Sequence, residues 1–163
     1  MYDSETYLLD HYREAGLITY IAIVNLTNLG AINLDKSITV EISPGELIDK
    51  ISILEIKMER ITDQDKLVNV KLEWEALNKS RSSSLTKSAT LDELTAQLKA
   101  VNTTLWAIED DIREFERLKN FGEEFVKLAR AIYSHNDKRA RIKRSINEFL
   151  GSKLIEEKSY ASY

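Results

Sequence analysis

A long apolar stripe in the second half of the chain is the feature that most restricts its fold. Between residues 94 and 115, apolar side chains recur at steps of three and four residues. They are Leu94, Leu98, Val101, Leu105, Ile108, Ile112 and Phe115. This spacing puts them on one face of an α-helix and follows the heptad pattern of coiled coils. Because such a face must be buried, the stripe predicts a long helix packed against other helices.

Similar stripes occur before and after this segment. The earlier one comprises Leu47, Ile51, Leu54, Met58 and Ile61, and the later one Phe121, Phe125, Leu128, Ile132, Ile142, Ile146 and Phe149. The chain has only five glycines and one proline in 163 residues, which is few for the many tight turns of a β-sandwich or barrel. We therefore predict a mainly α fold, an antiparallel helical bundle made of two helical hairpins.

Capping residues predict where the first hairpin begins and turns. In "SPGE", Ser43 is a candidate N-cap, Pro44 suits the first helical position, and Glu46 completes a capping box. A second apolar stripe lies on nearly the opposite helix face and comprises Leu67, Val70, Trp74 and Leu77. We therefore place a break at residues 62–65, with Asp63 as the cap of a second helix; one continuous helix buried on both sides is the alternative.

The second hairpin is predicted in the same way. The serine-rich segment 80–90 reads as a polar loop, and Thr90 with Glu93 forms a second capping box that restarts the helix. A short turn is expected near residues 119–123, and Gly151 stands where a helix C-terminus favours glycine.

The first 37 residues differ from the rest and predict a separate N-terminal extension of the bundle domain, residues 38–163. Residues 38–42, "ITVEI", alternate in polarity, and residues 17–24 are rich in β-branched side chains. Both patterns are compatible with short strands, so the extension is expected to contain short strands or to be buried in another way.

Composition excludes several classes of site. There is no cysteine, which excludes disulfides, zinc–thiolate sites and cysteine nucleophiles. The longest apolar stretch, residues 17–26, is about half of the ~20 residues that a transmembrane helix needs. No secretory signal pattern is seen at the start, and we expect a soluble, cytoplasmic protein.

The charge pattern argues against nucleic acid as a partner. The net charge of −4 gives no overall attraction to nucleic acid or anionic lipid. Residues 138–144, "KRARIKR", are strongly basic, but their charges are spread around the helix. Cations near a helix C-terminus are also favourable for the helix dipole alone.

Three blocks of sequence resemble a known family. They are "ITVEISPGELIDKISILEIKMERI", "LKAVNTTLWAIEDDIREFE" and "ARAIYSHNDKRARIKRSINEFLGSKLIEEKSY". Together they are similar to an uncharacterised bacterial and phage family that is catalogued as a domain of unknown function. The resemblance extends from about Ile38 to Tyr160, and it implies an all-helical domain with no assigned reaction.

The acidic segment "WAIEDDIREFE" (106–116) holds five carboxylates and one arginine. A helical wheel puts Asp110 and Glu114 on the solvent side, away from the apolar stripe. Glu109, Arg113 and Glu116 share a stripe with Asn102 and Trp106, at ion-pair spacing. We therefore interpret the segment either as a solvated helix face with internal ion pairs or as the edge of a pocket beside Trp106.

Metal binding would need carboxylates from a second helix, because one helix supplies too few oxygens on one face. The candidates are Glu46, Asp49, Glu55 and Glu109. Paired acidic motifs on facing helices hold magnesium in all-helical nucleotide pyrophosphatases, and "ELID" and "EDDI" have the residue types for such a site.

Two polar residues interrupt the last apolar stripe. His135 and Arg139 occupy core positions between Ile132 and Ile142. A buried, unpaired arginine is costly, so Arg139 needs a carboxylate on the first helices or on another subunit, or access to water. The polar layer either fixes register or a partner contact, or it lines a chamber in which Arg139 binds a phosphate or carboxylate.

Two functions from different classes follow from these patterns. The first is a binding or assembly protein that forms a homo-oligomer, expected to be a dimer, with a polar chamber for an anionic small ligand or a partner; it needs no cofactor. Its candidate ligand-binding residues are Asn102, Trp106, Glu109, Arg113, His135, Asn136 and Arg139. The alternative is a hydrolase of nucleotides or other phosphorylated small molecules that depends on Mg²⁺ or Mn²⁺, so whether the protein is an enzyme stays open.

Overall fold

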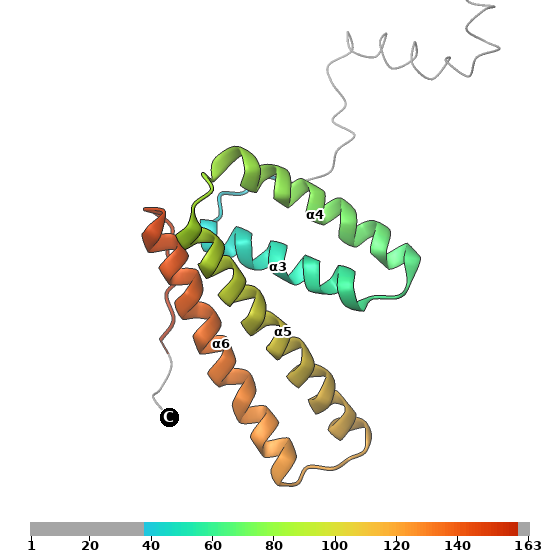
Figure 1. Ribbon diagram of the computed structural model, residues 1–163. Coiled ribbons are helices and arrows are strands. Elements are labelled where there is room, and N and C mark those ends of the chain that lie inside the picture. Colours follow the sequence, from blue (N-terminus) through green and yellow to red (C-terminus); the bar gives the residue numbers. More distant parts are fainter. Residues whose placement is uncertain (1–37, 160–163) are drawn as a thin grey trace, which may run out of the picture. The chain divides into compact units, whose positions relative to one another are not determined.

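The computed structural model describes residues 38–159, which form four α-helices (Figure 1). They are α3 (Pro44–Arg60), α4 (Gln64–Ser84), α5 (Ala89–Arg117) and α6 (Glu123–Phe149). The described part contains no strand, so the prediction of a mainly α fold is confirmed. No described helix has the length and apolar content to cross a bilayer. The predicted extension, residues 1–37, and its possible strand at 17–24 lie outside the described residues.

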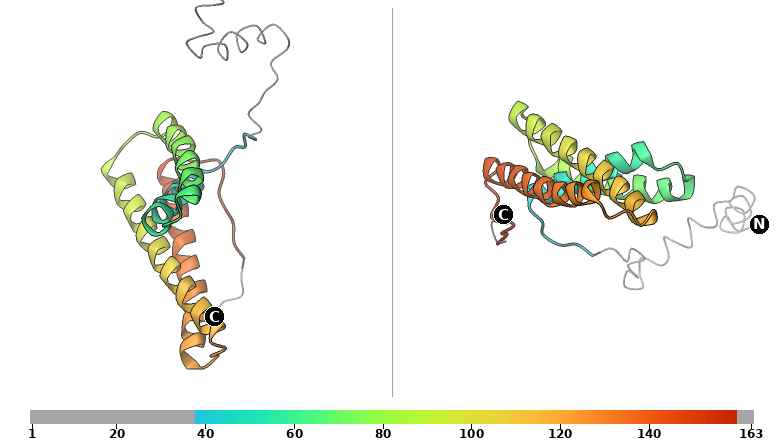
Figure 2. Two further views of the ribbon diagram at one scale, coloured as in Figure 1. Left: turned by 90° about the vertical axis from the view of Figure 1, so that its right-hand side faces the viewer. Right: turned by 90° about the horizontal axis from the view of Figure 1, so that it is seen from below.

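The helices form two hairpins, α3 with α4 and α5 with α6, as predicted. Helix α3 packs against all three other described helices, whereas α4 packs extensively only against α3. The α3–α4 hairpin lies against one end of the α5–α6 hairpin, and the rest of α5 and α6 extends away from it (Figures 1 and 2).

The core lies where α3 crosses α5 and α6. One buried cluster joins Ile48 of α3 to the apolar stripes of the second hairpin, namely Leu91, Leu98, Val101, Leu105, Ile142 and Ile146. Leu47, Ile51 and Leu54 of α3 are also buried, outside this cluster. Helix α3 is therefore buried on several faces, which explains its almost continuous run of buried residues.

The cap residues of the first hairpin are the predicted ones, although the Glu46 carboxylate, which a capping box turns back to Ser43, pairs with Lys143 of α6. The Ser43 hydroxyl accepts a hydrogen bond from the Glu46 backbone N–H at 3.2 Å, with Pro44 at the first helical position. The Asp63 carboxylate accepts from the backbone N–H groups of Asp65 and Lys66 and starts α4. The predicted break between the two helices is thus confirmed, although it spans residues 61–63 because α4 already begins at Gln64. On α4, Leu67, Val70, Trp74 and Leu77 are the buried or half-buried apolar residues, as their stripe predicts.

Three local predictions are wrong. Residues 38–42 are irregular rather than a strand. Helix α4 continues through Ser84, which leaves only residues 85–88 as the connection. Within this helix, the Ser80 and Ser83 hydroxyls donate to the backbone carbonyls of Ala76 and Ser80, so these serines are satisfied without leaving helical geometry.

The third error concerns the start of α5. Its N-cap is Ser88, whose hydroxyl accepts from the Leu91 backbone N–H at 3.2 Å, and not Thr90. Leu91, in the first turn of the helix, is a core residue with 2% exposure. The buried stripe of α5 therefore begins one turn before Leu94.

Candidate functional site

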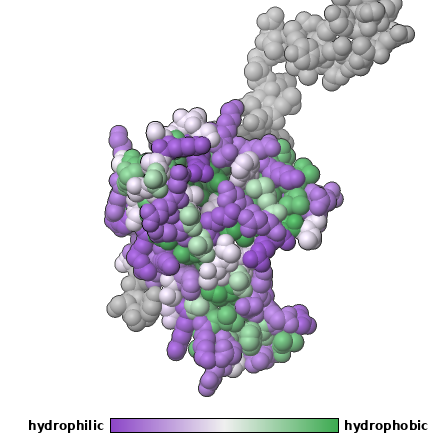
Figure 3. Space-filling model, in the orientation of Figure 1, coloured by the Kyte–Doolittle hydropathy of each residue, from purple (hydrophilic) through white to green (hydrophobic). Residues whose placement is uncertain are grey.

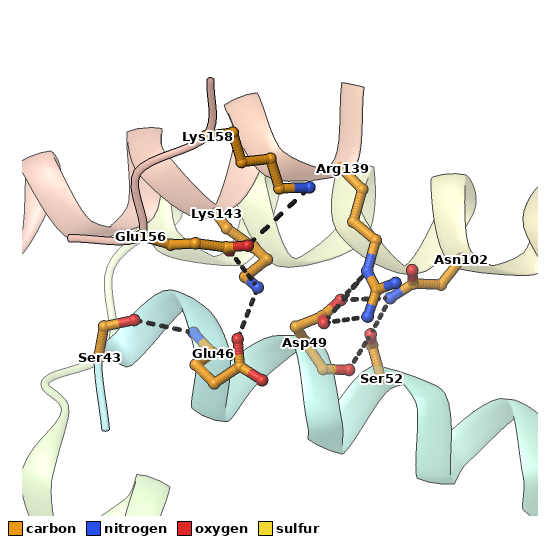
Figure 4. Close-up of polar contacts among 9 residues, drawn as sticks. All are labelled: Ser43, Glu46, Asp49, Ser52, Asn102, Arg139, Lys143, Glu156 and Lys158. Atoms are coloured by element: carbon orange, nitrogen blue, oxygen red, sulfur yellow. Dashed lines mark hydrogen bonds and ion pairs between the residues drawn. The ribbon is translucent and has the colours of Figure 1, made fainter. Parts of the chain in front are cut away.

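A buried aspartate on α3 is the centre of a polar cluster between α3, α5 and α6 (Figure 4). Gly45, Asp49 and Ser52 follow each other at steps of four and three residues, so they share one face of α3. All three are buried, and Asp49 is only 1% exposed. This face meets α6 and α5 across the interface, and its polar groups therefore need partners from those helices.

Arg139 of α6 supplies the charge partner. Its Nε donates to Asp49 Oδ1 at 2.9 Å and its Nη2 donates to Asp49 Oδ2, so the pair is bidentate. Hydrogen bonding to Asp49 outweighs burial and raises the pKa of Arg139 further above its usual value. Of the three alternatives for Arg139, a carboxylate on the first helices, a carboxylate on another subunit or access to water, the structure shows the first.

Asn102 of α5 completes the cluster. Its Nδ2 donates to Asp49 Oδ1 and to Ser52 Oγ, both at 2.8 Å. The Ser52 hydroxyl in turn donates to the backbone carbonyl of Asp49 at 2.8 Å. The Asp49 carboxylate of α3 is thus held by side chains from α5 and α6, which fixes how α3 lies across the second hairpin.

A second charged group lies one turn further along α6. Lys143 is buried, and its Nζ lies 2.5 Å from Glu46 Oε2 of α3 and 2.7 Å from Glu156 Oε2, beyond the end of α6. Burial lowers the pKa of Lys143, but its bonds to Glu156 and Glu46 outweigh burial and the net shift is upward. Glu46 therefore joins α3 to α6, in addition to its place in the capping sequence.

The start of α3 approaches α6 closely because residue 45 is glycine. Its backbone N–H donates to Asn147 Oδ1 at 2.7 Å. A Cβ at this position would lie 2.5 Å from the Lys143 carbonyl oxygen and 2.9 Å from Asn147 Oδ1. The approach leaves no room for a side chain, so Gly45 sets the distance between α3 and α6.

The structure brings together only some of the predicted ligand-binding residues. Asn102 and Arg139 share Asp49, as described above. His135 Nδ1 lies 2.8 Å from the Ala131 carbonyl oxygen, and Asn136 Nδ2 donates to the Ile132 carbonyl, so both bond within their own helix. Trp106 is half-buried one turn beyond Asn102.

The acidic segment forms ion pairs along its own helix surface. Arg113 Nη2 lies 2.9 Å from Glu109 Oε2, and the Arg113 and Glu109 side chains are 68% and 40% exposed. Two further pairs, Glu114–Arg117 and Glu116–Lys119, follow at spacing three. This arrangement matches the interpretation of the segment as a solvated face with internal pairs.

Each of the four candidate metal ligands lies beside a cation. Glu46 pairs with Lys143, Asp49 with Arg139, Glu55 with Lys99 and Glu109 with Arg113. Within residues 38–159, no three histidine, aspartate or glutamate side chains are grouped so that they could hold a metal ion. A metal at these carboxylates would have to displace their present partners.

Sequence reasoning did not identify Ser52, Lys143 or Glu156, and it treated Asp49 only as a metal ligand. The available signal was the stripe Gly45–Asp49–Ser52–Ile56, which carries polar residues at core spacing in the same way as His135 and Arg139 do on α6. Polar residues interrupt the apolar stripes of both α3 and α6. Because buried polar groups need hydrogen-bond partners, this pattern indicates that the polar residues of the two helices contact each other.

A family model covers residues 38–163. The chain belongs to DUF6165, a family of unknown function. No curated protein and no solved structure gives a significant match to the chain. Membership in DUF6165 agrees with the resemblance found in the sequence, and the polar cluster, from Gly45 to Glu156, lies wholly within the matched residues.

Proposed function

We propose that this protein is a binding and assembly protein that forms a homodimer through the outer part of its second hairpin. This part, residues 109–138, is called the distal half below; it comprises the end of α5, the turn and the first half of α6. The observation that supports the proposal is that the apolar stripes of α5 and α6 continue into the distal half, although no described helix covers it.

Burial changes abruptly along the hairpin. No residue from 109 to 138 is fully buried, although the stripe residues Ile112, Phe115, Phe125, Leu128 and Ile132 lie there. Phe121 and Val126 are exposed at 51% and 42%, and Leu118 is exposed as well. Apolar side chains gather over the hairpin in its lower part in Figure 3. An exposed apolar area of this kind is typical of an interaction surface.

A second copy of the chain suits this surface because its charges nearly cancel, with eight acidic and six basic residues between positions 109 and 138. The carboxylates of Glu109, Glu114 and Glu116 pair with basic residues of the same hairpin, and Glu124 pairs with Lys127. The face therefore lacks the strong single-sign charge that would select an oppositely charged partner. Two hairpins related by a twofold axis would complete a four-helix bundle around the shared stripes.

Sedimentation equilibrium tests this proposal. We expect the wild-type protein to be dimeric at micromolar concentration, and the double variant Phe121→Asp/Val126→Asp to be monomeric with unchanged helix content. The matched control is Val68→Asp on α4, because Val68 is similarly exposed, at 56%, but lies outside the distal half. A monomeric wild type, or a control that dissociates as readily as the double variant, would refute the assembly.

A further inference from the structure

The segment after α6 lies across two basic residues of the same helix. A left-handed glycine reverses the chain: Gly151 has φ 64°, and the Ser152 backbone N–H donates to the Asn147 carbonyl at 2.8 Å. This is the hydrogen-bond pattern of a Schellman cap. Residues 152–159, here called the C-terminal strap, then bring Glu156 and Glu157 back to α6 (Figure 4 shows Glu156).

Two adjacent acids of the strap meet two adjacent bases of α6. Glu156 Oε2 lies 2.7 Å from Lys143 Nζ. The Glu157 carboxylate accepts from both terminal nitrogens of Arg144, at 3.2 and 3.3 Å. A bidentate arginine–carboxylate contact is geometrically selective. Together the pairs form a small recognition surface for two consecutive carboxylates.

The basic side of this surface is held in place without the strap. Glu46 of α3 holds Lys143 from the opposite side at 2.5 Å, and Glu148 of α6 holds Arg144 at 3.1 Å. With the strap in place the Lys143 side chain is only 10% exposed, and its pair with Glu46 does not involve the strap. The receptor residues are therefore preorganised, which lowers the cost of binding a ligand.

The strap is attached much less firmly. Every residue from 153 to 159 is exposed, including Leu154 and Ile155, so little apolar burial fixes it. Its contacts with α6 are ion pairs. The Glu157 side chain is 72% exposed, and such a surface pair contributes little; Glu156 is 44% exposed and pairs with the buried Lys143. The Lys143 ammonium lowers the pKa of Glu156, which keeps this carboxylate ionised.

We propose that Lys143 and Arg144 form a binding site for a segment of a partner polypeptide with two consecutive acidic residues, and that the strap occupies this site in the isolated chain. A tethered ligand of this kind competes at an effective concentration on the order of millimolar. A partner segment displaces it when it supplies the same two carboxylates together with additional contacts.

Fluorescence anisotropy tests the site with a labelled peptide of residues 152–159, "SKLIEEKS". The receptor is the full chain carrying Glu156→Gln and Glu157→Gln, which keeps the strap but removes its carboxylates. We expect this variant to bind the peptide at least tenfold more tightly than the wild type, and the affinity to fall as salt is raised. The matched control peptide has glutamine at both acidic positions and should bind at least tenfold more weakly.

Two further variants keep the proposal falsifiable. Arg144→Gln, added to the double glutamine variant, changes a residue on the helix surface and should weaken peptide binding by about tenfold while the fold is retained. Adding Val126→Asp should leave the affinity unchanged, which separates this site from the proposed dimer surface. Equal binding by wild type and the double glutamine variant, or equal binding of the acidic and glutamine peptides, would overturn the proposal.

Discussion

The two halves of the α5–α6 hairpin carry similar sequence patterns but have different surroundings. In the half crossed by α3, apolar stripe residues such as Leu98 and Ile146 are completely buried. In the distal half, stripe residues such as Ile112 and Leu128 are only half-buried. The difference shows that a heptad pattern specifies which face of a helix is buried, but not how many helices cover that face.

The same contrast applies to ion pairs. Asp49–Arg139 in the crossed half and Glu109–Arg113 in the distal half are both arginine–carboxylate pairs. The first joins two helices around a carboxylate with 1% exposure, whereas the second lies along one helix in solvent. The contributions of these two ion pairs to the free energy of unfolding should therefore differ by several-fold. Substitution of the arginine in each pair measures this difference.

The largest effect is expected for Arg139→Leu. This change leaves Asp49 buried without its charge partner, and removal of one member of a buried pair costs about 3 kcal/mol. Urea denaturation at one fixed protein concentration measures the loss, because any dimerisation makes stability depend on concentration. The double variant Asp49→Leu/Arg139→Leu should recover much of the loss, since neither charge then remains unpaired.

A small loss for Arg139→Leu would instead mean that Arg139 belongs to an open ligand chamber. In that case the change would be tolerated while ligand binding is lost. The result therefore separates the two interpretations of the polar layer in α6.

The contact between α3 and α6 is tested by adding a single methyl group. Gly45→Ala places a Cβ 2.5 Å from a backbone oxygen of α6, and such overpacking costs about 2 kcal/mol. The control is Gly122→Ala in the distal turn, where the nearest atom lies 3.4 Å away. We expect Gly122→Ala to change the free energy of unfolding by less than about 0.5 kcal/mol. Equal effects at both glycines would show that α3 does not approach α6 as described.

The sequence predicted much of this fold because helix periodicity and caps are local properties. Ser43, Asp63 and Gly151 were recognised from residue type and position alone. The prediction of a loop at residues 80–90 is wrong because serine composition indicates a loop, while the Ser80 and Ser83 hydroxyls bond to carbonyls of their own helix. Helix propensity is a weak guide for serine, because its hydroxyl can find a local hydrogen-bond partner in a loop or in a helix.

The candidate site was predicted less completely, because its contacts join residues far apart in the chain. The need of Arg139 for a carboxylate followed from its position on the apolar stripe, but the choice of Asp49 depends on how α3 crosses α6. Helical spacing says nothing about that crossing. Glu156 could not be assigned either, since its contact with Lys143 requires the chain reversal at Gly151.

A smaller effect is expected at the N-terminus of α5, where Ser88 replaces Thr90 as the cap. Ser88→Ala removes the side-chain acceptor of the Leu91 N–H and should cost about 1 kcal/mol. Thr90→Ala should change stability by less than about 0.5 kcal/mol, because position 90 is exposed and inside the helix. Thermal unfolding of both variants checks which residue caps α5. A larger loss of stability for Thr90→Ala than for Ser88→Ala would show that Thr90 is the cap.

The smallest effect is expected for Arg113→Ala in the distal half. The Arg113 guanidinium pairs with Glu109 four residues earlier and also donates to the Glu109 backbone carbonyl at 2.8 Å. Exposed pairs at this spacing contribute about 0.3 kcal/mol, and salt screens them further. Alanine has the higher helix propensity, which offsets part of the lost pair. Urea denaturation should therefore give a free energy of unfolding within about 0.5 kcal/mol of the wild type. A loss close to that of Arg139→Leu would mean that the Glu109–Arg113 pair is buried in the assembled protein, which would place it within the dimer surface rather than at its solvated edge.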